Sequence, residues 1–432
     1  MLEKQIFPKK AILVSAAVGP EEKEDLEEHQ QELKMLVQTL KMQVLDTFQV
    51  VLKSITPATF IGSGKVQEIK ETVELLDAKI VVFDNDLKPS QERNLEEMWG
   101  NVVVTTRTGI ILEVFRRHAR TREAKTQVEL ARLEYLSTRL VGMWSHLSRQ
   151  DGSVGVRGGP GEKQVEIDRR IVNDRIAKLK EKLAKIEQQK EVQSSQRQQE
   201  FRVAIVGYTN AGKSTLMKAM TQEEVLVQDQ LFATLDTTVR KCELDSSHTI
   251  LLSDTVGFIR KLPHRLVASF KSTLKEAREA DLILKVTDLS SDYWKEHLHT
   301  VETILEELDA HKIPSMIICN KIDKCDNSDF QKVKHNYPDA IFISAIDHIG
   351  IDNLKKKILD FLHEKEVRIK LTIPADNMKS IVALRKYGTI ETEEYENSQA
   401  FIDIVCYQNI WNKLKDQLTD NIEVKSVEKV SG

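Results

Sequence analysis

Two short motifs carry residue types suited to binding a purine nucleotide. The run Gly207-Tyr-Thr-Asn-Ala-Gly-Lys-Ser214 has the Gly-x-x-x-x-Gly-Lys-Ser spacing of a phosphate-binding loop. Its glycines let backbone N–H groups turn toward an anion, and its lysine reaches the terminal phosphates. The later run Asn320-Lys-Ile-Asp323 supplies a carboxylate that accepts two hydrogen bonds from guanine, whereas adenine has an acceptor where guanine has a donor. Together the motifs predict GTP rather than ATP as the ligand.

Strand-like segments must deliver both motifs. Residues 201–206 are apolar and β-branched and end at Gly207, and residues 213–220 have the composition and spacing of a helix. Strand, loop and helix in this order is the context that a phosphate loop requires. The phosphates then lie at a helix N-terminus, where free N–H groups and the helix dipole favour negative charge. Further buried strands are expected at 249–253, 281–287, 315–319 and 340–344.

Other segments carry candidate magnesium, switch and base contacts. Ser214 is a candidate Mg²⁺ ligand, and Asp254 is expected to bind the ion through water. Thr234 is expected to close over Mg²⁺ and the γ-phosphate, and Gly257, lacking a side chain, lets its N–H approach that phosphate. The predicted nucleotide contacts are Gly207, Tyr208, Thr209, Asn210, Ala211, Gly212, Lys213, Ser214, Thr215, Phe232, Ala233, Thr234, Leu235, Asp236, Asp254, Thr255, Val256, Gly257, Asn320, Lys321 and Asp323, with N–H groups of Ser344, Ala345 and Ile346 on the guanine carbonyl; Lys213, Thr234 and Gly257 are the catalytic candidates.

Each piece taken alone also occurs in proteins that bind no nucleotide. Their order, each at the end of an expected strand, favours the nucleotide interpretation. The run Gly62-Ser-Gly-Lys65 differs, because it lacks the four-residue spacer and Val66 stands where a Ser or Thr is needed. We expect a turn there.

Composition sets the outer limits. A chain of 432 residues with 30% charged and 41% hydrophobic residues is expected to be soluble and to form two to four domains. The four cysteines show no paired metal-ligand spacing, which fits a reduced, cytoplasmic setting. No apolar run approaches the length that spans a bilayer. Lys9-Lys10 and the apolar run after them resemble a short export signal, but an acidic stretch follows, and we interpret residues 11–18 as a strand.

Four regions are expected: an N-terminal α/β domain (1–115), a helical hairpin with a linker (116–200), a P-loop domain (201–366) and a small α+β domain (367–432). In the first, strands at 11–18, 44–52, 79–83 and 102–105 alternate with helices, which predicts a parallel sheet covered by helices. In the last, a strand at 367–373 is followed by a helix, two strand candidates and a closing helix near 408–418.

The second region predicts two long helices. The first covers residues 121–147, and after Gly161 the second repeats apolar residues in steps of four, three, four and three. That spacing is typical of a two-stranded seam, and a short connection makes the pair antiparallel. Residues 188–200 are expected to be a linker. Residues 116–200 hold 19 Lys and Arg against 12 Asp and Glu, a net +7 in a chain of net −4, which favours a polyanionic partner or solvated helix faces equally.

The loop between these helices, 151–161, contains five glycines, more than a helix connection requires. One interpretation is a floppy tip. The other is a tip whose bare backbone approaches RNA, with Arg149, Arg157 and Lys163 for phosphates beside Gly158 and Gly159.

The chain resembles the HflX family of ribosome-associated GTPases, in the Obg–HflX superfamily, over nearly its full length. The similarity lies in Ser90-Gln-Glu-Arg-Asn-Leu95, Thr106-Arg-Thr-Gly-Ile110, Gln127-Val-Glu-Leu-Ala131, Gly158-Gly-Pro-Gly-Glu162, Gly207 to Ser214, Phe232-Ala-Thr-Leu-Asp236 and Asp254-Thr-Val-Gly-Phe258. Two positions depart from the family pattern: Lys163 replaces a threonine, and Thr237 replaces a proline. Neither is a predicted phosphate ligand, although Lys163 changes the charge of the tip.

The resemblance implies GTP hydrolysis with Mg²⁺, binding to the large ribosomal subunit and its rRNA, and splitting or rescue of stalled ribosomes under stress, or help in subunit assembly. It also implies a cytoplasmic protein with the glycine-rich tip near the peptidyl-transferase region, and we expect a monomer that binds no DNA and does not insert into a membrane. Two alternatives stay open: an RNA remodeller that also uses ATP, and an assembly scaffold in which GTP only sets conformation.

Two residues bear on the rate of hydrolysis. Phe258 stands where many GTPases carry the glutamine that positions water. We therefore expect slow intrinsic turnover, within a few-fold of the order of 10⁻⁴ s⁻¹, and acceleration when the ribosome reorders the switches. Asn210 has two interpretations: it helps a K⁺ ion bridge the phosphates in place of an arginine finger, or it only stabilises the loop. Equal rates in potassium and sodium buffers would exclude the first.

Overall fold

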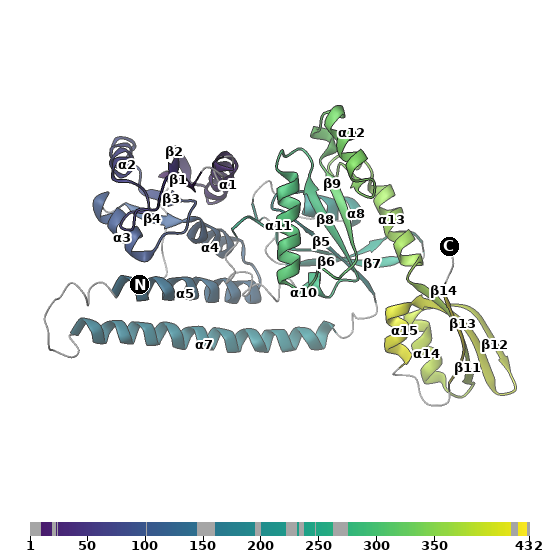
Figure 1. Ribbon diagram of the computed structural model, residues 1–432. Helices are drawn as coiled ribbons and strands as arrows, with labels where there is room; N and C mark the ends of the chain where they lie inside the picture. The colour runs from purple at the N-terminus through teal and green to yellow at the C-terminus, as the bar shows by residue number, and fades with distance from the viewer. Residues whose placement is uncertain are drawn as a thin grey trace.

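A computed structural model shows three sheets and a pair of long helices (Figure 1). It describes residues 10–19, 23, 25–100, 102–144, 160–194, 200–221, 231–232, 237–246, 248–261, 275–415 and 422–429. The side chains of 140–168, 187, 190–194, 327–329, 379, 383, 386–387, 409 and 413–414 are excluded. The N-terminal and six-stranded sheets lie side by side, the long helices run along one side of them, and the C-terminal sheet lies at the opposite end from the N-terminal sheet.

The N-terminal sheet is parallel, as predicted, with the strand order β2-β1-β3-β4. Apolar strands with buried residues on both faces form its centre, and amphipathic helices cover it. Pro89 is the first residue of one of these helices, a position where an N–H group would have no partner within the helix. Just before it, the Lys88 N–H donates to Gln91 Oε1 at 2.9 Å. The elements are β1 (Lys10–Val18), α1 (Leu26–Thr39), β2 (Gln43–Leu52), α2 (Ser63–Leu76), β3 (Ile80–Phe83), α3 (Pro89–Met98) and β4 (Val103–Thr106).

Helix α4 (Arg107–His118) follows β4 directly and was not predicted. Its residues from Ile110 to Phe115 are all buried, so it lacks the alternation of apolar and polar faces that marks a surface helix. It lies between the N-terminal sheet and the long helices.

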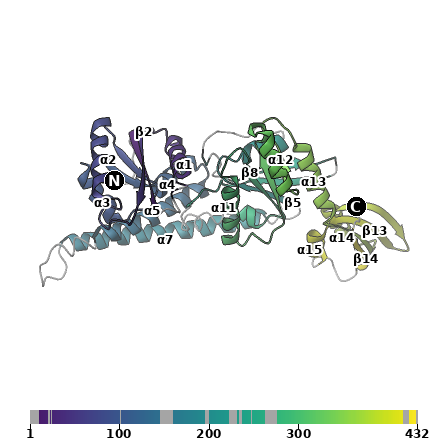
Figure 2. The same ribbon diagram turned by 45° about the horizontal axis from the view of Figure 1, so that its top comes forward.

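Helices α5 (Arg122–Trp144) and α7 (Pro160–Ser194) form the predicted antiparallel hairpin, seen from a second side in Figure 2. One stripe of α5, including Val128 and Ala131, packs against the N-terminal core. Another stripe, Leu130 and Leu133, packs against Leu179 and Leu183 of α7. The predicted start of the linker at residue 188 is wrong, because α7 continues to Ser194. Polar composition does not end a helix that has no Gly or Pro.

The central sheet has the order β10-β9-β8-β5-β7-β6, with five parallel strands and an antiparallel edge. The edge strand β6 was not predicted, because its sequence Thr-Val-Arg-Lys-Cys-Glu is mostly polar. The elements are β5 (Phe201–Gly207), α8 (Lys213–Thr221), β6 (Thr238–Glu243), β7 (Thr249–Asp254), α10 (Lys275–Arg278), β8 (Leu282–Asp288), α11 (Trp294–Glu307), β9 (Ser315–Asn320), a 3₁₀ turn (Ile322–Lys324), α12 (Asn327–Asn336), β10 (Ile341–Phe342) and α13 (Ile351–His363).

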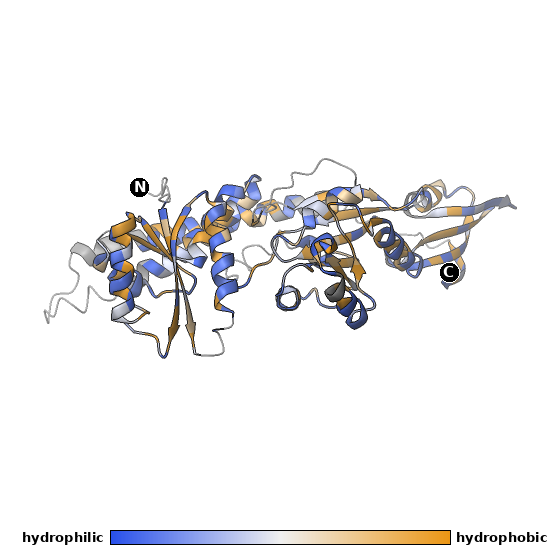
Figure 3. Ribbon diagram, turned by 90° about the horizontal axis from the view of Figure 1, so that it is seen from above, coloured by the Kyte–Doolittle hydropathy of each residue, from blue (hydrophilic) through white to orange (hydrophobic). Residues whose placement is uncertain are grey.

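The C-terminal sheet is antiparallel, in the order β12-β13-β11-β14, and two helices pack on it. Its elements are β11 (Glu366–Pro374), α14 (Met378–Tyr387), β12 (Thr389–Glu396), β13 (Gln399–Tyr407), α15 (Gln408–Lys415) and β14 (Glu423–Lys429), the last of which was not predicted. Figure 3 shows apolar strands inside the sheets and mixed colouring on the helices around them. Among the described residues, no helix is both long and apolar enough to cross a membrane. The predicted α/β fold class with a P-loop unit, a hairpin and a C-terminal α+β unit is confirmed.

Candidate nucleotide site

The phosphate loop occupies the turn from β5 into α8. Asn210 and Gly212 have φ values of 60° and 88°, and this left-handed backbone lets the loop fold back on itself. The Lys213 ammonium is buried over the loop and donates to the carbonyls of Gly207 at 3.1 Å and Tyr208 at 2.7 Å. Burial lowers the pKa of Lys213 to about 8, and the nearby Asp254 carboxylate opposes that shift. A buried cation next to the free N–H groups of a helix N-terminus attracts and binds phosphate.

Oxygen ligands for a divalent ion meet beside this lysine. The Ser214 hydroxyl donates to Asp254 Oδ2 at 2.7 Å, so the two predicted magnesium residues are adjacent. A hydroxyl with a carboxylate is the all-oxygen set that Mg²⁺ prefers. A Cβ added to Gly257 would lie 2.9 Å from Lys213 Nζ and 3.0 Å from Thr209 Cα, so the Asp-x-x-Gly turn reaches the phosphate loop only because this residue has no side chain.

The base-recognition motif is connected to the phosphate loop by Asn320. Its Nδ2 donates to the Ala211 carbonyl at 2.9 Å, and its Oδ1 accepts from the Ala345 N–H at 3.0 Å. The Ser344 hydroxyl donates to Asp323 Oδ1 at 2.6 Å, which fixes the orientation of the carboxylate. Lys321 has φ 65° and its ammonium pairs with Asp288 Oδ2 at 2.7 Å. The segments that follow β5, β9 and β10 therefore meet at one edge of the sheet.

Several predicted contacts have other partners here. The N–H groups of Ser344 and Ala345 donate to Ile349 O at 3.1 Å and to Asn320 Oδ1 at 3.0 Å. Thr255 and Val256 are buried side chains, and Phe232 packs edge-on against Phe115. Thr215 lies in the first turn of α8, half-buried. The predicted residues Ala233, Thr234, Leu235, Asp236, Arg149, Arg157, Gly158 and Gly159 lie outside the described residues, as does the side chain of Lys163.

Phe258 is a core residue. Its side chain is 1% exposed, its N–H donates to the Gly207 carbonyl at 3.0 Å, and its carbonyl accepts from the Thr209 N–H at 2.7 Å. An apolar ring in this position holds the Asp-x-x-Gly turn against the phosphate loop. It offers no polar atom to a water molecule.

The comparisons with known proteins cover almost the whole chain. Residues 27–116 match the family described as "GTP-binding GTPase N-terminal", 118–197 the "GTP-binding GTPase Middle Region", and 202–321 the "50S ribosome-binding GTPase" family. "GTPase HflX" of Magnetococcus marinus is 40% identical over 405 residues, which covers 93% of this chain and 94% of that protein. The chain belongs to the HflX family. It binds and hydrolyses GTP, as members of this GTPase family do.

A second relative supports the same family, and one solved structure is similar. "GTPase HflX" of Escherichia coli strain K12 is 42% identical to this HflX-family chain over 370 residues, covering 85% of the chain and 86% of the relative. A crystal structure of a GTP-binding protein from Sulfolobus solfataricus in complex with GDP is 25% identical, with a TM-score of 0.42, and covers 82% of this chain and 98% of that one.

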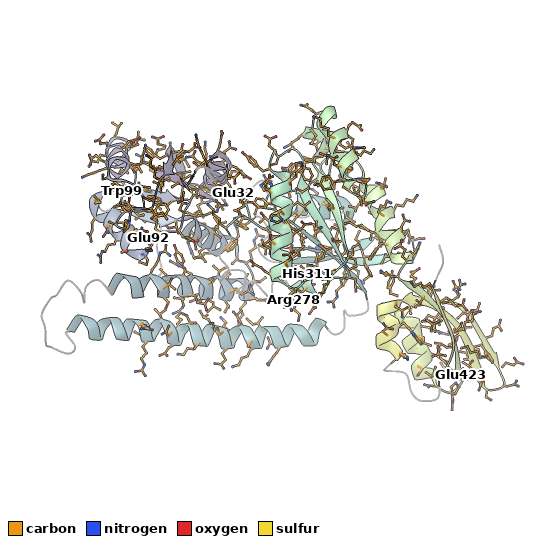
Figure 4. All side chains as sticks on the ribbon, viewed as in Figure 1. Glu32, Glu92, Trp99, Arg278, His311 and Glu423 are labelled. Carbon is orange, nitrogen blue, oxygen red and sulfur yellow. The ribbon has the colours of Figure 1, made fainter. Side chains whose placement is uncertain are left out.

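Sequence reasoning missed a polar cluster that joins the phosphate loop of this HflX protein to its N-terminal sheet. The Tyr208 hydroxyl donates to Glu32 Oε1 at 2.5 Å and accepts from the Arg260 N–H at 2.9 Å. Glu32 in turn pairs with the buried Arg107, which also donates to Asp84 Oδ1 at 2.6 Å. Figure 4 shows Glu32 on the side of the N-terminal unit that faces the six-stranded sheet.

A second set of contacts extends this polar cluster. Lys261 Nζ pairs with Asp84 Oδ2 at 2.9 Å, and Arg260 pairs with Glu28 Oε2 at 2.5 Å. His297 stacks on Tyr208 with 3.9 Å between ring centroids and lies 3.0 Å from Glu28 Oε1. Arg260 and Lys261 lie three and four residues after Gly257, the last residue of the Asp-x-x-Gly turn. These contacts connect the segment after the Asp-x-x-Gly turn to the N-terminal unit.

Replacing Gly212 with alanine is expected to lower affinity for GDP at least about tenfold. The left-handed backbone costs a non-glycine residue about 1–2 kcal/mol, and the new Cβ would lie 2.2 Å from Asn320 Nδ2, displacing the side chain that connects the two motifs. Calorimetry measures the effect.

Gly64→Ala is the matched control for Gly212→Ala. The expected turn at Gly62-Ser-Gly-Lys65 is wrong: Ser63 begins α2, so Gly64 is helical and an added Cβ meets nothing within 4 Å. We expect Gly64→Ala to stabilise the chain by about 0.5–1 kcal/mol and to leave GDP affinity unchanged. Equal affinity losses in both variants would contradict the assignment of Gly212.

Replacing Tyr208 with phenylalanine is expected to destabilise the chain by about 1–3 kcal/mol, because the buried Glu32 carboxylate loses a hydrogen-bond donor. Thermal unfolding provides the measurement. Tyr395→Phe is the control, since that hydroxyl also donates to a glutamate, Glu393, at 2.5 Å, but on the exposed surface. A shift no larger than that of the control would show that the Tyr208 hydroxyl stabilises the chain no more than an exposed hydrogen bond does.

Proposed function

We propose that the chain is a GTP-controlled factor that binds the large ribosomal subunit, and that it splits or rescues stalled ribosomes or assists subunit assembly. The match of residues 202–321 to a family described as "50S ribosome-binding GTPase" supports the partner. The excess of positive charge in residues 116–200 supports contact with rRNA. We also propose that the chain acts in the cytoplasm and as a monomer.

The observation that carries the proposal is the continuous route from nucleotide to hairpin. The Asp-x-x-Gly turn continues into Arg260 and Lys261, whose ion pairs reach Glu28 and Asp84 of the N-terminal unit. That unit packs against α5 through Val128 and Ala131, and Arg139 of α5 pairs with Glu92 of α3. Loss of the γ-phosphate would therefore alter the orientation of the hairpin toward the ribosome.

We propose four functional units, 1–115, 116–200, 201–366 and 367–432, with nucleotide contacts as predicted above. Ser214 would hold Mg²⁺ directly and Asp254 through water, with Thr234 completing the site, and a bound ion would supply positive charge to the β- and γ-phosphates. Lys213 supplies the fixed positive charge, and the Gly257 N–H contacts the γ-phosphate. Because Phe258 is buried and apolar, it does not position the attacking water, and intrinsic hydrolysis is slow until the ribosome reorders the switches.

Base selection rests on Asp323, whose carboxylate is oriented by Ser344. A carboxylate accepts from both guanine donors and meets no such pair on adenine. This disfavours ATP as the main fuel and so disfavours an RNA remodeller driven by ATP. Competition between GTP and ATP in a binding assay separates the two.

Co-sedimentation with separated ribosomal subunits tests the proposal. With a non-hydrolysable GTP analogue the chain is expected to pellet with large subunits, more than with GDP, and to be released by salt. Replacing Arg149, Arg157 and Lys163 together with alanine should weaken binding and flatten the salt dependence. Binding to small subunits, or binding that ignores the nucleotide, would refute it.

A charge-matched control separates the tip from general charge. Arg169, Arg170 and Lys178 are exposed on α7, so their triple alanine variant removes the same charge from the body of the hairpin. We expect a smaller loss than for the tip variant. Equal losses would assign binding to net charge alone, and the tip would have no specific part.

A further inference from the structure

Two histidines and a glutamate come together where the C-terminal sheet meets the six-stranded sheet (Figure 1). His248 immediately precedes β7, His363 is the last residue of α13, and Glu366 is the first residue of β11. One ligand atom from each lies within 4.8 Å of the others. His363 and Glu366 are three residues apart, but His248 lies more than a hundred residues before them, so only the fold brings it to them.

His248 is oriented as a metal ligand is. Its Nδ1 lies 2.9 Å and 3.0 Å from the two carboxylate oxygens of Asp245, which leaves Nε2 directed at Glu366 Oε1, 3.3 Å away. A carboxylate on the outer ring nitrogen fixes the tautomer and raises the basicity of the other nitrogen, as in many metal sites. The His363 ring lies edge-on to it, with 5.1 Å between ring centroids.

The spacing fits a small tetrahedral ion. Two ligand atoms at 2.0–2.1 Å from zinc are separated by about 3.3 Å, which is the His248 to Glu366 distance of 3.3 Å. Ligand atoms as far apart as 4.8 Å need to close by roughly 1.5 Å to reach that separation, a movement available to the half-buried side chain of His363 at its helix end.

The donor set also selects the class of ion. Two imidazole nitrogens and one carboxylate suit borderline transition-metal ions, whereas Mg²⁺ and Ca²⁺ prefer oxygen alone. The set therefore differs from the hydroxyl and carboxylate at Ser214 and Asp254. Occupancy here is chemically separable from occupancy of the nucleotide site.

We propose that His248, His363 and Glu366 bind one divalent transition-metal ion of the zinc class, with Asp245 as a positioning residue and the fourth position left to water. The ion joins the β6–β7 turn of the six-stranded sheet to the first residue of the C-terminal sheet. It fixes the direction in which that sheet leaves α13. The site does not depend on the nucleotide or on the ribosome.

Zinc titration of the full chain tests this. The chain is stripped with a chelator, saturated with GDP and Mg²⁺ so that the nucleotide site is filled, and titrated with Zn²⁺ against a chromophoric chelator. We expect one Zn²⁺ per chain, a higher Tm with zinc, and the visible absorption of a tetrahedral site when Co²⁺ is used. His248→Ala and His363→Ala should each lower affinity at least tenfold, and Asp245→Asn by roughly 10–100-fold.

His335→Ala is the control, because His335 is exposed on α12; it should leave affinity unchanged. Glu366→Gln keeps the size of the side chain and is expected to fold and bind GDP normally while losing zinc. The proposal is overturned if the wild-type chain takes up no stoichiometric zinc, or if the His248 and Glu366 variants bind it as the wild type does. The residues would then form only a hydrogen-bonded cluster, with the His248 ring between Asp245 and Glu366.

Discussion

GTP turnover is expected to fall by roughly 10²–10³-fold when Lys213 is replaced by alanine, the loss typical of removing one preorganised group that stabilises transition-state charge. The Lys213 ammonium is buried and fixed by the carbonyls of Gly207 and Tyr208. A cation from solution would first have to be immobilised at this position, whereas the lysine is already held there. Single-turnover hydrolysis with saturating GTP gives the rate separately from affinity.

Lys218→Ala is the matched control, because Lys218 is exposed on the same helix, α8. It should keep full activity and stability. Lys213→Met, which retains the apolar stem, separates loss of charge from loss of packing. Turnover by Lys213→Ala within threefold of wild type would contradict the assigned role. If that variant instead loses hydrolysis but still completes the ribosomal cycle with a non-hydrolysable analogue, the scaffold alternative is favoured.

Replacing Asp323 with asparagine is expected to weaken GTP and GDP binding by roughly 10²–10³-fold. Each hydrogen bond to a charged group contributes about 1.5–3 kcal/mol. When one carboxylate oxygen becomes an NH₂ group, one of the two bonds to guanine is replaced by a donor that faces a donor, and the other loses its charged acceptor. Xanthosine nucleotides carry a carbonyl where guanine carries its amino group, so the variant should bind them better than the wild type does. Competition with a fluorescent GDP measures both changes.

Asp339→Asn controls for the loss of one negative charge, since Asp339 is exposed in the turn after α12. It should leave both affinities unchanged. An Asp323→Asn variant that retained guanine preference would remove Asp323 from base recognition. Unaltered GTP affinity together with measurable ATP turnover would instead favour the RNA remodeller.

Local signals in the sequence were sufficient for the phosphate loop and the hairpin. The strand before Gly207 and the helix after it are adjacent in sequence, so their order predicts the loop without knowledge of the rest of the chain. The seam of α7 repeats at Ile176, Leu179 and Leu183, and those residues do meet α5. Both features depend on periodicity and short-range sterics.

What the sequence did not reveal depends on tertiary neighbours. Helix α4 is buried on nearly all sides and so shows no polar face, while the edge strands β6 and β14 are too polar to look like strands. Arg107 is a buried cation only because Glu32 and Asp84 meet it from other elements. The pair His363 and Glu366, three residues apart, does not mark a metal site by itself, and His248, which completes the cluster, lies far away in the sequence just before β7.

GTP turnover by the purified chain, measured with and without isolated large ribosomal subunits, tests the central claim most directly. We predict turnover on the order of 10⁻⁴ s⁻¹ for the chain alone and a large acceleration by large subunits but not by small ones. Fast hydrolysis by the isolated chain, or a rate that large subunits leave unchanged, would contradict a ribosome-activated GTPase.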